Sequence, residues 1–253
     1  MRLKDRIAIV TGGGSGLGAG IARRFAEEGA SLVLADINGN NAETVASEIR
    51  EGQSKAIAVE MDVTDYNAAE ALVAQTVEEY GTLDILVNSA GTSNHMSFLD
   101  AKPKEFQHII KVNLEGTMYC GQHAARVMAA KGYGRIVNIA SISGERAGVG
   151  RTGYGVSKFA VIGLTKQMAL ELGPQGVNVN AVGPGPVDTP LTRVAHSDVT
   201  REAYLDLIPL GRYGTVEEMA DAAAYLAGEQ ASYVNGHVLF VDGGFVSVGI
   251  QKE

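Results

Sequence analysis

The sequence predicts an α/β fold in which helices cover both faces of a doubly wound, seven-stranded parallel sheet. Short apolar runs alternate with helical patterns along the 253 residues, and such alternation is typical of a parallel sheet. The apolar runs are nearly continuous, as strands buried on both faces require. The 32 glycines lie at turns between the runs and no Pro/Ser-rich linker interrupts them, so we expect a single domain over residues 1–253.

The first two strands are predicted on either side of a helix. Residues 7–10 read Ile-Ala-Ile-Val and end in a glycine-rich turn, after which a helical pattern of apolar residues runs to Gly29. A strand at 31–36 and a charged helix at about 41–50 follow. The remaining five strands are expected at 56–59, 84–87, 135–139, 177–182 and 237–241. Because ligands of such sheets bind beyond the carboxyl ends of the strands, the segments that follow these ends should form one cleft.

Composition excludes several classes of protein. The formal net charge is −8 and no Lys/Arg cluster is present, so nucleic acid is not an expected partner. No apolar run approaches bilayer length and no signal-peptide core follows Met1, which predicts a cytoplasmic protein without a membrane partner. Cys120 is the only cysteine and the five histidines show no ligand spacing, so we expect no metal site and interpret the histidines as surface or packing residues.

Tyr154 and Lys158 are four residues apart, which on a helix places both side chains on one face. The neighbouring ammonium favours the phenolate, so the pKa of Tyr154 is expected to fall below its usual value of about 10. A phenol of this kind can act as a general acid or base. The alternative is a half-buried ring beside a solvated lysine. Ser141, thirteen residues before the tyrosine, and the glycine-rich turn favour the catalytic interpretation.

The glycine-rich turn at residues 11–18 follows the first strand and opens a helix, which is the context of a dinucleotide-binding turn. Glycine lets the backbone approach a pyrophosphate, and the helix N-terminus favours its negative charge. The cofactor-binding candidates in this turn are Gly12, Gly14, Ser15, Gly16, Leu17 and Gly18. A tight connection without a ligand is the alternative interpretation.

Asp36 ends the second strand, where its carboxylate can accept hydrogen bonds from the hydroxyl groups of an adenosine ribose. It would repel a 2′-phosphate, Ile37 follows it, and no arginine stands beside it. The sequence therefore predicts NAD as the cofactor in preference to NADP, although an aspartate that only starts a turn is the simpler alternative. The next two strand ends add further candidates with small residues among them, which are Asp62, Val63, Asn88, Ala90 and Gly91.

Six motifs in this order resemble those of the short-chain dehydrogenase/reductase family, in its single-domain NAD(H)-dependent branch. They are the turn at 11–18, Asn88-Ser89-Ala90-Gly91, Asn113, Ser141, Tyr154 with Lys158, and Pro184-Gly185 through Thr189. The resemblance covers almost the whole chain and implies a Rossmann-type sheet. Ser89, where the family often has Asn, and Ala140, where it often has Ser, are departures that do not touch the chemistry.

The resemblance implies a role for each residue of this set. Tyr154 would be the general acid/base, and Ser141 would hydrogen-bond the substrate oxygen. Lys158 would hold the nicotinamide ribose and lower the pKa of Tyr154, while Asn113 would support a proton-relay water near the lysine. The cofactor would also contact Pro184, Gly185, Val187 and Thr189, with the last two at its carboxamide.

These roles predict an NAD(H)-dependent oxidoreductase that interconverts a secondary alcohol and a ketone by hydride transfer. The site would need a donor that stabilises the developing oxyanion and an acid that protonates it, and Ser141 and Tyr154 suit these tasks. The alternatives are a non-catalytic dinucleotide-sensing regulatory protein and a reductase of the 3-oxoacyl type. The complete catalytic set argues against the sensor, which would need only the glycine turn and Asp36.

Two segments are expected to decide the substrate. The connection at about 190–211 carries Leu191, Val194, His196, Tyr204, Leu207 and Ile208, and connections of this length are often active-site lids; the alternative is a pair of short surface helices. The turn at 143–153 adds Ser143, Arg146 and Arg151. We expect an arginine there to favour a small polar substrate such as a polyol, sugar, hydroxy acid or cyclic alcohol, whereas solvated arginines are the alternative.

The helices around residues 104–130 and after Tyr154 are apolar beyond one stripe. Such helices require a second partner surface or deep burial within one subunit. The family resemblance implies a homotetramer that forms through these helices and the C-terminal strand. We therefore expect a homotetramer, or a homodimer, of this chain.

Overall fold

The computed structural model describes residues 1–189, 192 and 196–247. Its sheet has seven strands, all parallel, in the order β3-β2-β1-β4-β5-β6-β7. The strands are β1 (Ile7–Thr11), β2 (Ser31–Asp36), β3 (Ala56–Glu60), β4 (Ile85–Asn88), β5 (Gly134–Ile139), β6 (Val177–Pro184) and β7 (Val238–Val241). Each lies within two residues of its predicted range, and the doubly wound sheet is confirmed.

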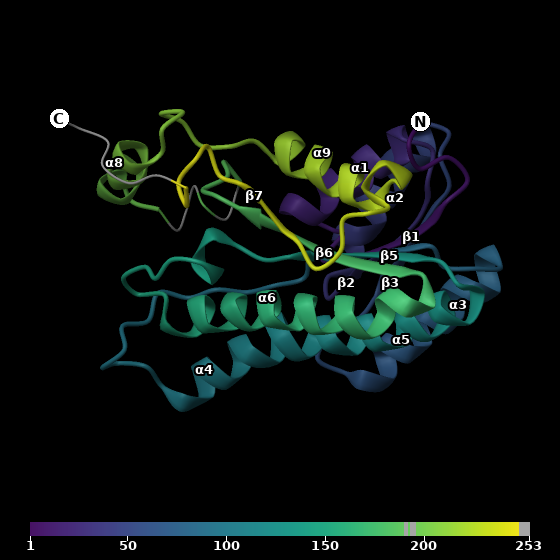
Figure 1. Ribbon diagram of the computed structural model, residues 1–253, viewed down its shortest axis with the longest axis horizontal. Coiled ribbons are helices and arrows are strands. Elements are labelled where there is room, and N and C mark those ends of the chain that lie inside the picture. Colours follow the sequence, from purple (N-terminus) through teal and green to yellow (C-terminus); the bar gives the residue numbers. More distant parts are fainter. Residues whose placement is uncertain (190–191, 193–195, 248–253) are drawn as a thin grey trace.

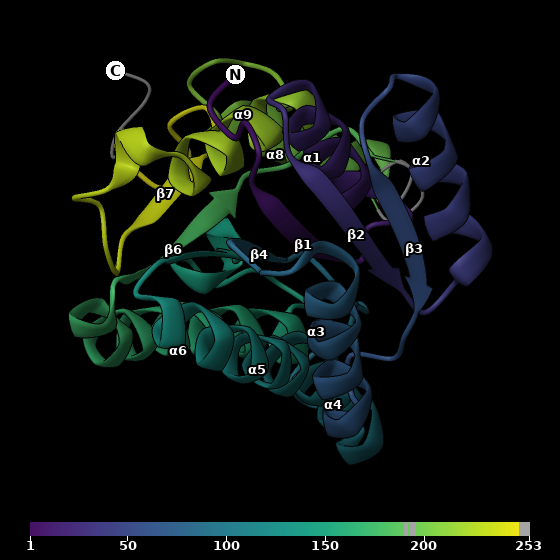
Figure 2. The same ribbon diagram turned by 90° about the vertical axis from the view of Figure 1, so that its right-hand side faces the viewer.

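Two layers of helices enclose the sheet, as Figure 1 and Figure 2 show. One face carries α1 (Gly16–Glu27), α2 (Gly39–Glu51) and α9 (Val216–Ala227), whose buried side chains form one core with β1 and β2. The opposite face carries α3 (Tyr66–Tyr80), α4 (Pro103–Ile110), α5 (Gly116–Lys131) and α6 (Thr152–Leu172). The side chains of α3 and α5 pack into a second core beneath the sheet.

The chain runs outward in both directions from β1, the third strand in the order of the sheet. It passes through β2 to the β3 edge, returns to β4 beside β1, and then continues to β7. The connections that follow β1 and β4 therefore lead in opposite directions along the sheet. This is a topological switch point, where ligands of open parallel sheets bind. Thr11 ties the ends of these two strands together, because its Oγ accepts hydrogen bonds from the backbone N–H groups of Ser89 and Ala90, each at 3.2 Å.

The single helix expected at 104–130 is divided by a π-helical turn. This turn, Lys111–Glu115, joins α4 to α5 and contains Asn113. Within long helices, π-helical turns are often found at functional sites. The extra residue changes the direction in which Asn113 projects relative to a regular helix.

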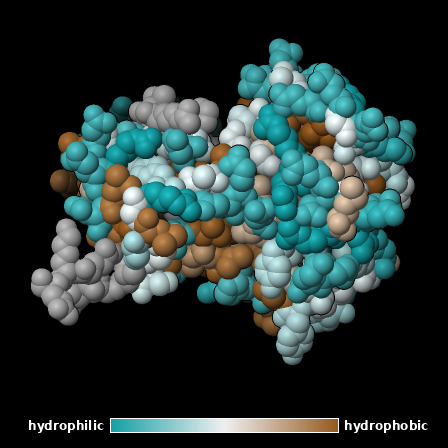
Figure 3. All heavy atoms as spheres, turned by 90° about the horizontal axis from the view of Figure 1, so that it is seen from above, coloured by the Kyte–Doolittle hydropathy of each residue, from teal (hydrophilic) through white to brown (hydrophobic). Residues whose placement is uncertain are grey.

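The connection expected to form a lid is only partly described. Residues 190–191 and 193–195, and with them Leu191 and Val194, lie outside the described residues. Within the rest, α8 (Asp198–Leu207) lies at one end of the molecule (Figure 1). Seen from above (Figure 3), hydrophobic atoms gather mainly toward this end. Val199 on α8 is 76% exposed. No helix in the described part of the chain is long and apolar enough to cross a membrane.

Candidate active site

Ser141, Tyr154 and Lys158 come together beyond the carboxyl end of β5. Ser141 follows this strand and caps a short 3-10 helix, Ile142–Gly144, which packs on α6. A Cβ on Gly144 would lie 2.7 Å from the Lys158 carbonyl oxygen, so glycine permits this close approach. The Ser141 hydroxyl thereby reaches the hydroxyl of Tyr154, to which it is hydrogen-bonded.

The predicted decrease in the pKa of Tyr154 is wrong for this structure. Burial raises the pKa of the phenol above its usual value, and this effect exceeds the lowering by the Ser141 hydrogen bond and the Arg151 charge. Lys158 Nζ lies 5.7 Å from the centroid of the Tyr154 ring, and its charge does not reverse this direction. Desolvation, which disfavours the charged phenolate, therefore outweighs the nearby charges.

Lys158 is almost completely buried, with 6% of its surface exposed. Its Nζ donates a hydrogen bond to the Ile139 carbonyl oxygen at 2.7 Å, and burial lowers its pKa to about 8. No carboxylate pairs with it within the described ranges. An ammonium has three N–H donors, so Lys158 retains donors for further acceptors at the end of the sheet.

The side chain of Asn113 is fully buried and joins three segments. Its Oδ1 accepts a hydrogen bond from the Thr92 backbone N–H at 2.8 Å, and its Nδ2 donates to the Thr92 carbonyl and to Ser157 Oγ. These bonds fix the loop after β4 against the first turns of α6. The amide thus positions the backbone around Lys158 and has no direct contact with Tyr154.

The glycine-rich turn has the close contacts that a dinucleotide-binding turn requires. A Cβ on Gly18 would lie 2.1 Å from the Gly12 carbonyl oxygen, so α1 begins directly against the turn. Gly12 has φ +65° and packs against Ala90, whereas Gly16 has φ +52° with open space around it. Ser15 precedes α1 and its hydroxyl makes no capping hydrogen bond. The N-terminus of α1 is therefore open toward a ligand at Ser15 and Gly16. The remaining candidates, Gly14 and Leu17, lie in the same turn.

Asp36 lies between this turn and the start of α2. Its carboxylate accepts hydrogen bonds from the backbone N–H groups of Gly14 at 3.0 Å and Asn38 at 2.9 Å. Ile37 beside it is 70% exposed. Glu60 pairs with Asp36 in the register of β2 and β3, and its side chain packs against Gly39. This second carboxylate was not predicted from the sequence, because only strand pairing brings it to Asp36.

The other candidates at the ends of β3 and β4 divide into two groups. Ala90 packs against Gly12 in the glycine-rich turn, and Gly91 lies beside the side chains of Asn113 and Lys158. Asp62 is exposed and accepts a hydrogen bond from the Thr64 backbone, while Val63 packs against Gly116.

The side chain of Asn88 is directed into the core. The amide is buried and donates to Asn138 Oδ1 at 2.9 Å and to the Thr117 carbonyl at 3.4 Å. Its side chain therefore links β4, β5 and α5 and is part of the core, so that only its backbone is left for a cofactor.

The candidates after β6 lie beyond the carboxyl end of this strand, at the same edge of the sheet. Pro184 ends β6, Gly185 packs against Asp242 and Val187 forms an isolated bridge with Gly214. Val187 and Thr189 are buried. Their position beyond the carboxyl end of a strand agrees with the predicted cofactor site, but nothing in their contacts identifies the ligand.

The substrate candidates do not all lie near Tyr154. Arg151 and Tyr204 do, since both affect the pKa of its hydroxyl. Ser143 is buried, and its backbone N–H donates to Ser141 Oγ at 3.1 Å. Arg146 is directed to the C-terminal segment, where it donates to the Val246 carbonyl at 2.7 Å.

His196 belongs to this site. It was predicted only as one residue of the connection at 190–211 and otherwise as a surface or packing histidine, but its ring accepts a hydrogen bond from Arg151 at 3.1 Å and stacks on Tyr204 at 5.3 Å. Tyr213 also contacts it, at 3.0 Å. No sequence spacing signals this cluster, because it joins three connections that are distant along the chain.

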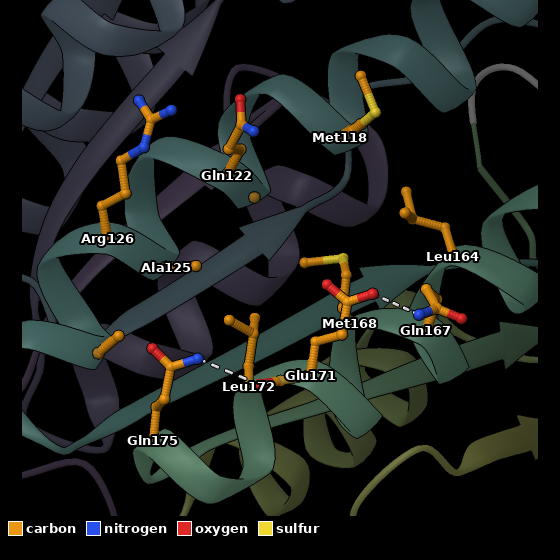
Figure 4. A pocket seen from close by; sticks show the side chains of 12 residues that line it. Met118, Gln122, Ala125, Arg126, Leu164, Gln167, Met168, Glu171, Leu172 and Gln175 are labelled. Atoms are coloured by element: carbon orange, nitrogen blue, oxygen red, sulfur yellow. Dashed lines mark hydrogen bonds between the residues drawn. The ribbon is translucent and has the colours of Figure 1, made fainter.

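A depression of about 320 Å³ lies elsewhere, between α5 and α6 (Figure 4). Met118, Leu164, Met168 and Leu172 contribute its apolar lining, and Gln167 and Gln175 bond to Glu171 at one side. None of the catalytic or cofactor candidates lines it. In addition, no group of three or more His, Cys, Asp or Glu that could hold a metal ion occurs in the part of the chain that is described.

Comparisons with known proteins agree with this geometry. A family model described as enoyl-(acyl carrier protein) reductase matches residues 12–246. The 3-oxoacyl-(acyl-carrier-protein) reductase of Thermotoga maritima is 37% identical over 246 residues, which cover 97% of this chain and 100% of that protein. The cis-4-hydroxycyclohexanecarboxylate dehydrogenase of Sinomonas cyclohexanicum is 39% identical, with coverage of 96% and 98%.

A solved structure has the same fold. It is a gluconate 5-dehydrogenase from Burkholderia cenocepacia J2315 in complex with NADP and tartrate, and it superposes with a TM-score of 0.94 at 35% identity. The superposition covers 98% of each chain. The fold and the arrangement of its layers are therefore those of a known group of dehydrogenases and reductases.

Proposed function

Because the chain belongs to the short-chain dehydrogenase/reductase family, we propose that it is an NAD(H)-dependent oxidoreductase that interconverts a secondary alcohol and a ketone. Proteins of this family are oxidoreductases that use a nicotinamide dinucleotide. The observation that carries the proposal is the contact of Ser141 with Tyr154, next to a buried lysine and at the same sheet edge as the glycine-rich turn.

The residues of this chain suit a bound dinucleotide. Gly16 and Ser15 leave the N-terminus of α1 open to a pyrophosphate, and Asp36 offers carboxylate oxygens to ribose hydroxyls. Lys158 has N–H donors beyond the one that it gives to Ile139. When bound, the nicotinamide would accept a hydride during alcohol oxidation and return it during ketone reduction.

Tyr154 would move the proton in this reaction. In oxidation its phenolate takes the proton of the substrate hydroxyl, and in reduction the neutral phenol returns it. Ser141 donates a hydrogen bond to the substrate oxygen as negative charge develops there. Lys158 supplies a positive charge behind the tyrosine, and Asn113 holds the loop at Thr92 that borders the lysine.

NAD is the proposed cofactor because two carboxylates face the expected position of the adenosine ribose. Asp36 and Glu60 are paired in the register of neighbouring strands, and both would repel a 2′-phosphate. No lysine or arginine occurs at residues 37–49 to compensate for them. The related gluconate 5-dehydrogenase contains NADP, so the proposal depends on the carboxylates of this chain.

We further propose a small polar substrate, a cytoplasmic location and a homotetramer that forms through α5 and α6. The Sinomonas and Burkholderia relatives are named for polar substrates, which supports the proposed substrate class.

A 3-oxoacyl reductase is the second candidate function, favoured by the Thermotoga relative. The complete catalytic set leaves the sensing alternative without a supporting observation.

Steady-state assays with NAD and NADP test the proposed function. The substrates are cyclohexanol, 3-hydroxybutyrate, gluconate and 4-hydroxycyclohexanecarboxylate, with reduced nicotinamide absorbance as the readout. We expect turnover with a preference for NAD, and Tyr154→Phe should lower kcat by roughly 10²- to 10⁴-fold while NADH still binds. Near-normal turnover of this variant would exclude the assigned acid/base.

The cofactor preference is tested separately. Asp36→Asn combined with Glu60→Gln should improve kcat/KM with NADP relative to NAD, because it removes both repelling charges. An unchanged ratio, or a wild-type preference for NADP, would contradict the assignment of NAD.

A further inference from the structure

Arg151 is a cationic side chain beside the catalytic tyrosine, and no carboxylate pairs with it in the part of the chain that the structure describes. Its guanidinium carbon lies 5.7 Å from the centroid of the Tyr154 ring. Within the described ranges no Asp or Glu forms an ion pair with it, whereas the nearby Arg201 is paired with Asp188 at 3.3 Å. A partly buried charge without a counter-ion is unfavourable, and an anionic ligand would compensate for it.

His196 orients this guanidinium without neutralising it. Nη2 of Arg151 donates to Nε2 of His196 at 3.1 Å, so the ring must be neutral and carry its proton on Nδ1. That nitrogen then donates to the Tyr213 hydroxyl at 3.0 Å; this tautomer is assigned from the hydrogen-bond partners. Burial and the charges of Arg151 and Arg201 lower the pKa of His196, which favours the neutral ring. A carboxylate in the place of His196 would have neutralised the charge of Arg151 as well as oriented its guanidinium.

The backbone and the aromatic neighbours hold the pair in place. Arg151 forms an isolated bridge with Met96, whose N–H donates to the Gly150 carbonyl at 2.8 Å. Gly150 has φ +70°, and the His95 ring occupies the space that a side chain at this position would need. Tyr204 stacks on His196 with ring centroids 5.3 Å apart. Arg151 is thus fixed at both its backbone and its guanidinium.

We propose that Arg151, oriented by His196, binds a carboxylate of the substrate, so that the enzyme acts on small hydroxy acids and the corresponding oxo acids. Guanidinium N–H groups pair with carboxylate oxygens through charge-assisted hydrogen bonds, and Arg151 uses one nitrogen for His196. Because Arg151 borders Tyr154, only a short carbon chain separates the carboxylate from the reacting carbon. This inference rests on the proposed function and names its substrate class.

The other arginines near the site do not provide this receptor. Arg201 is paired with Asp188 and lies over the Tyr213 ring at 4.7 Å. Arg146 lies over Phe245 at 5.7 Å and donates to the Val246 carbonyl. His196 is a positioning residue, because its contact with a substrate would pass through Arg151.

Paired substrates test the inference. Each hydroxy acid of the panel above is compared with its primary amide, which keeps size and polarity but lacks the charge. The wild-type enzyme should prefer at least one acid over its amide by roughly 10- to 100-fold in kcat/KM, as expected for a charged hydrogen bond. Arg151→Gln should abolish this preference by raising KM for the acids more than KM for the amides. Acids and amides are compared at the pH optimum of each variant, because the Arg151 charge also lowers the pKa of Tyr154.

Three further variants separate orientation from charge. Arg151→Lys should retain part of the preference, and His196→Gln should reduce it by raising KM for the acids more than KM for the amides. Arg23→Gln is the matched control, since it removes the same charge from an exposed pair with Glu48, and it should keep the full preference. Equal losses for acids and amides in Arg151→Gln, or a wild-type enzyme without acid preference, would overturn the proposal.

A binding measurement keeps the result independent of catalysis. Proton NMR of ¹³C-labelled histidine identifies the His196 signal as the one lost in His196→Gln. Titration with the hydroxy acids should shift this signal in the wild type but not in Arg151→Gln, and the amides should not shift it. Carboxylate binding without turnover would refute the proposed function alone, whereas turnover without this shift would refute the receptor alone.

Discussion

Tyr154 combines opposing influences on one hydroxyl group. Burial raises its pKa, whereas the Ser141 hydrogen bond and the Arg151 charge lower it. Sequence spacing predicts the neighbours of the tyrosine but not its desolvation, which depends on everything packed around it. The net direction of the pKa shift therefore had to come from the tertiary structure.

The pH profile of alcohol oxidation should reflect this balance. Oxidation needs the phenolate, so the rate should rise with pH through the pKa of Tyr154, and reduction should show the opposite trend. Ser141→Ala removes a contact that lowers this pKa, so its oxidation limb should move to higher pH. Measurements of kcat/KM against pH for a neutral alcohol would show this; an unmoved midpoint would mean that Ser141 does not control the phenol.

Lys158 should reduce the stability of the fold that contains it. Its pKa falls from 10.5 to about 8 on burial, so below pH 8 it is charged in both states and the full desolvation cost is present. Between pH 8 and pH 10.5 the unfolded chain binds more protons than the folded protein, so the free energy of unfolding rises with pH. Lys158→Met should thus raise Tm by roughly 5 °C at pH 7 while it abolishes turnover.

Calorimetry of the protein without added cofactor, at pH 7 and pH 10, checks this prediction. The gain in Tm should be smaller at the higher pH, because the wild-type lysine is then largely neutral in the folded state. A lower Tm for the variant at pH 7 would show that the bond to the Ile139 carbonyl outweighs desolvation.

At the scale of elements, the start of α1 depends on glycine at one position above all. A Cβ on Gly18 would lie 2.1 Å from the Gly12 carbonyl oxygen, so Gly18→Ala must displace α1 from the turn. We expect a loss of about 1–3 kcal/mol in the free energy of unfolding and weaker NADH binding. Denaturant unfolding and fluorescence titration measure the two effects.

Gly52→Ala is the control for this prediction. Gly52 has an ordinary φ of −73° at the end of α2, and its nearest contact to an added Cβ is 3.4 Å. This variant should change stability by less than about 0.5 kcal/mol. Equal behaviour of the two variants would show that the turn tolerates a side chain.

At the scale of the whole molecule, α5 and α6 expose an apolar surface that one subunit leaves uncovered. Leu170 and Phe159 are 73% and 49% exposed on α6, and Met118 is 43% exposed on α5. The depression in Figure 4 lies between these helices. Exposed apolar surface of this kind is typical of subunit interfaces.

Leu170→Glu should therefore shift the protein to a smaller assembly in light scattering at micromolar concentration. Leu99→Glu, at an equally apolar and 93% exposed residue outside these helices, should leave the assembly unchanged. A monomeric wild-type protein would contradict the proposed tetramer.

The sequence by itself determined the order and type of the strands and the residues at their carboxyl ends. Apolar runs of strand length and a glycine-rich turn are local signals, and a parallel sheet brings all its carboxyl ends to one edge. The position of Ser141 after β5 follows from this rule, whereas Tyr154 and Lys158 were assigned to the same site by their spacing on a helix and by the resemblance to the family. The same local logic identified Asp36.

Only the tertiary structure decided which side chains meet across distant connections. It brought His196 to Arg151, placed Glu60 beside Asp36, and turned the Asn88 amide into the core. It also fixed the π-helical turn at Asn113 and the desolvation of Tyr154 and Lys158. The physical reason is that desolvation and long-range contacts depend on packing in three dimensions, whereas periodicity and turn chemistry act between neighbours in sequence.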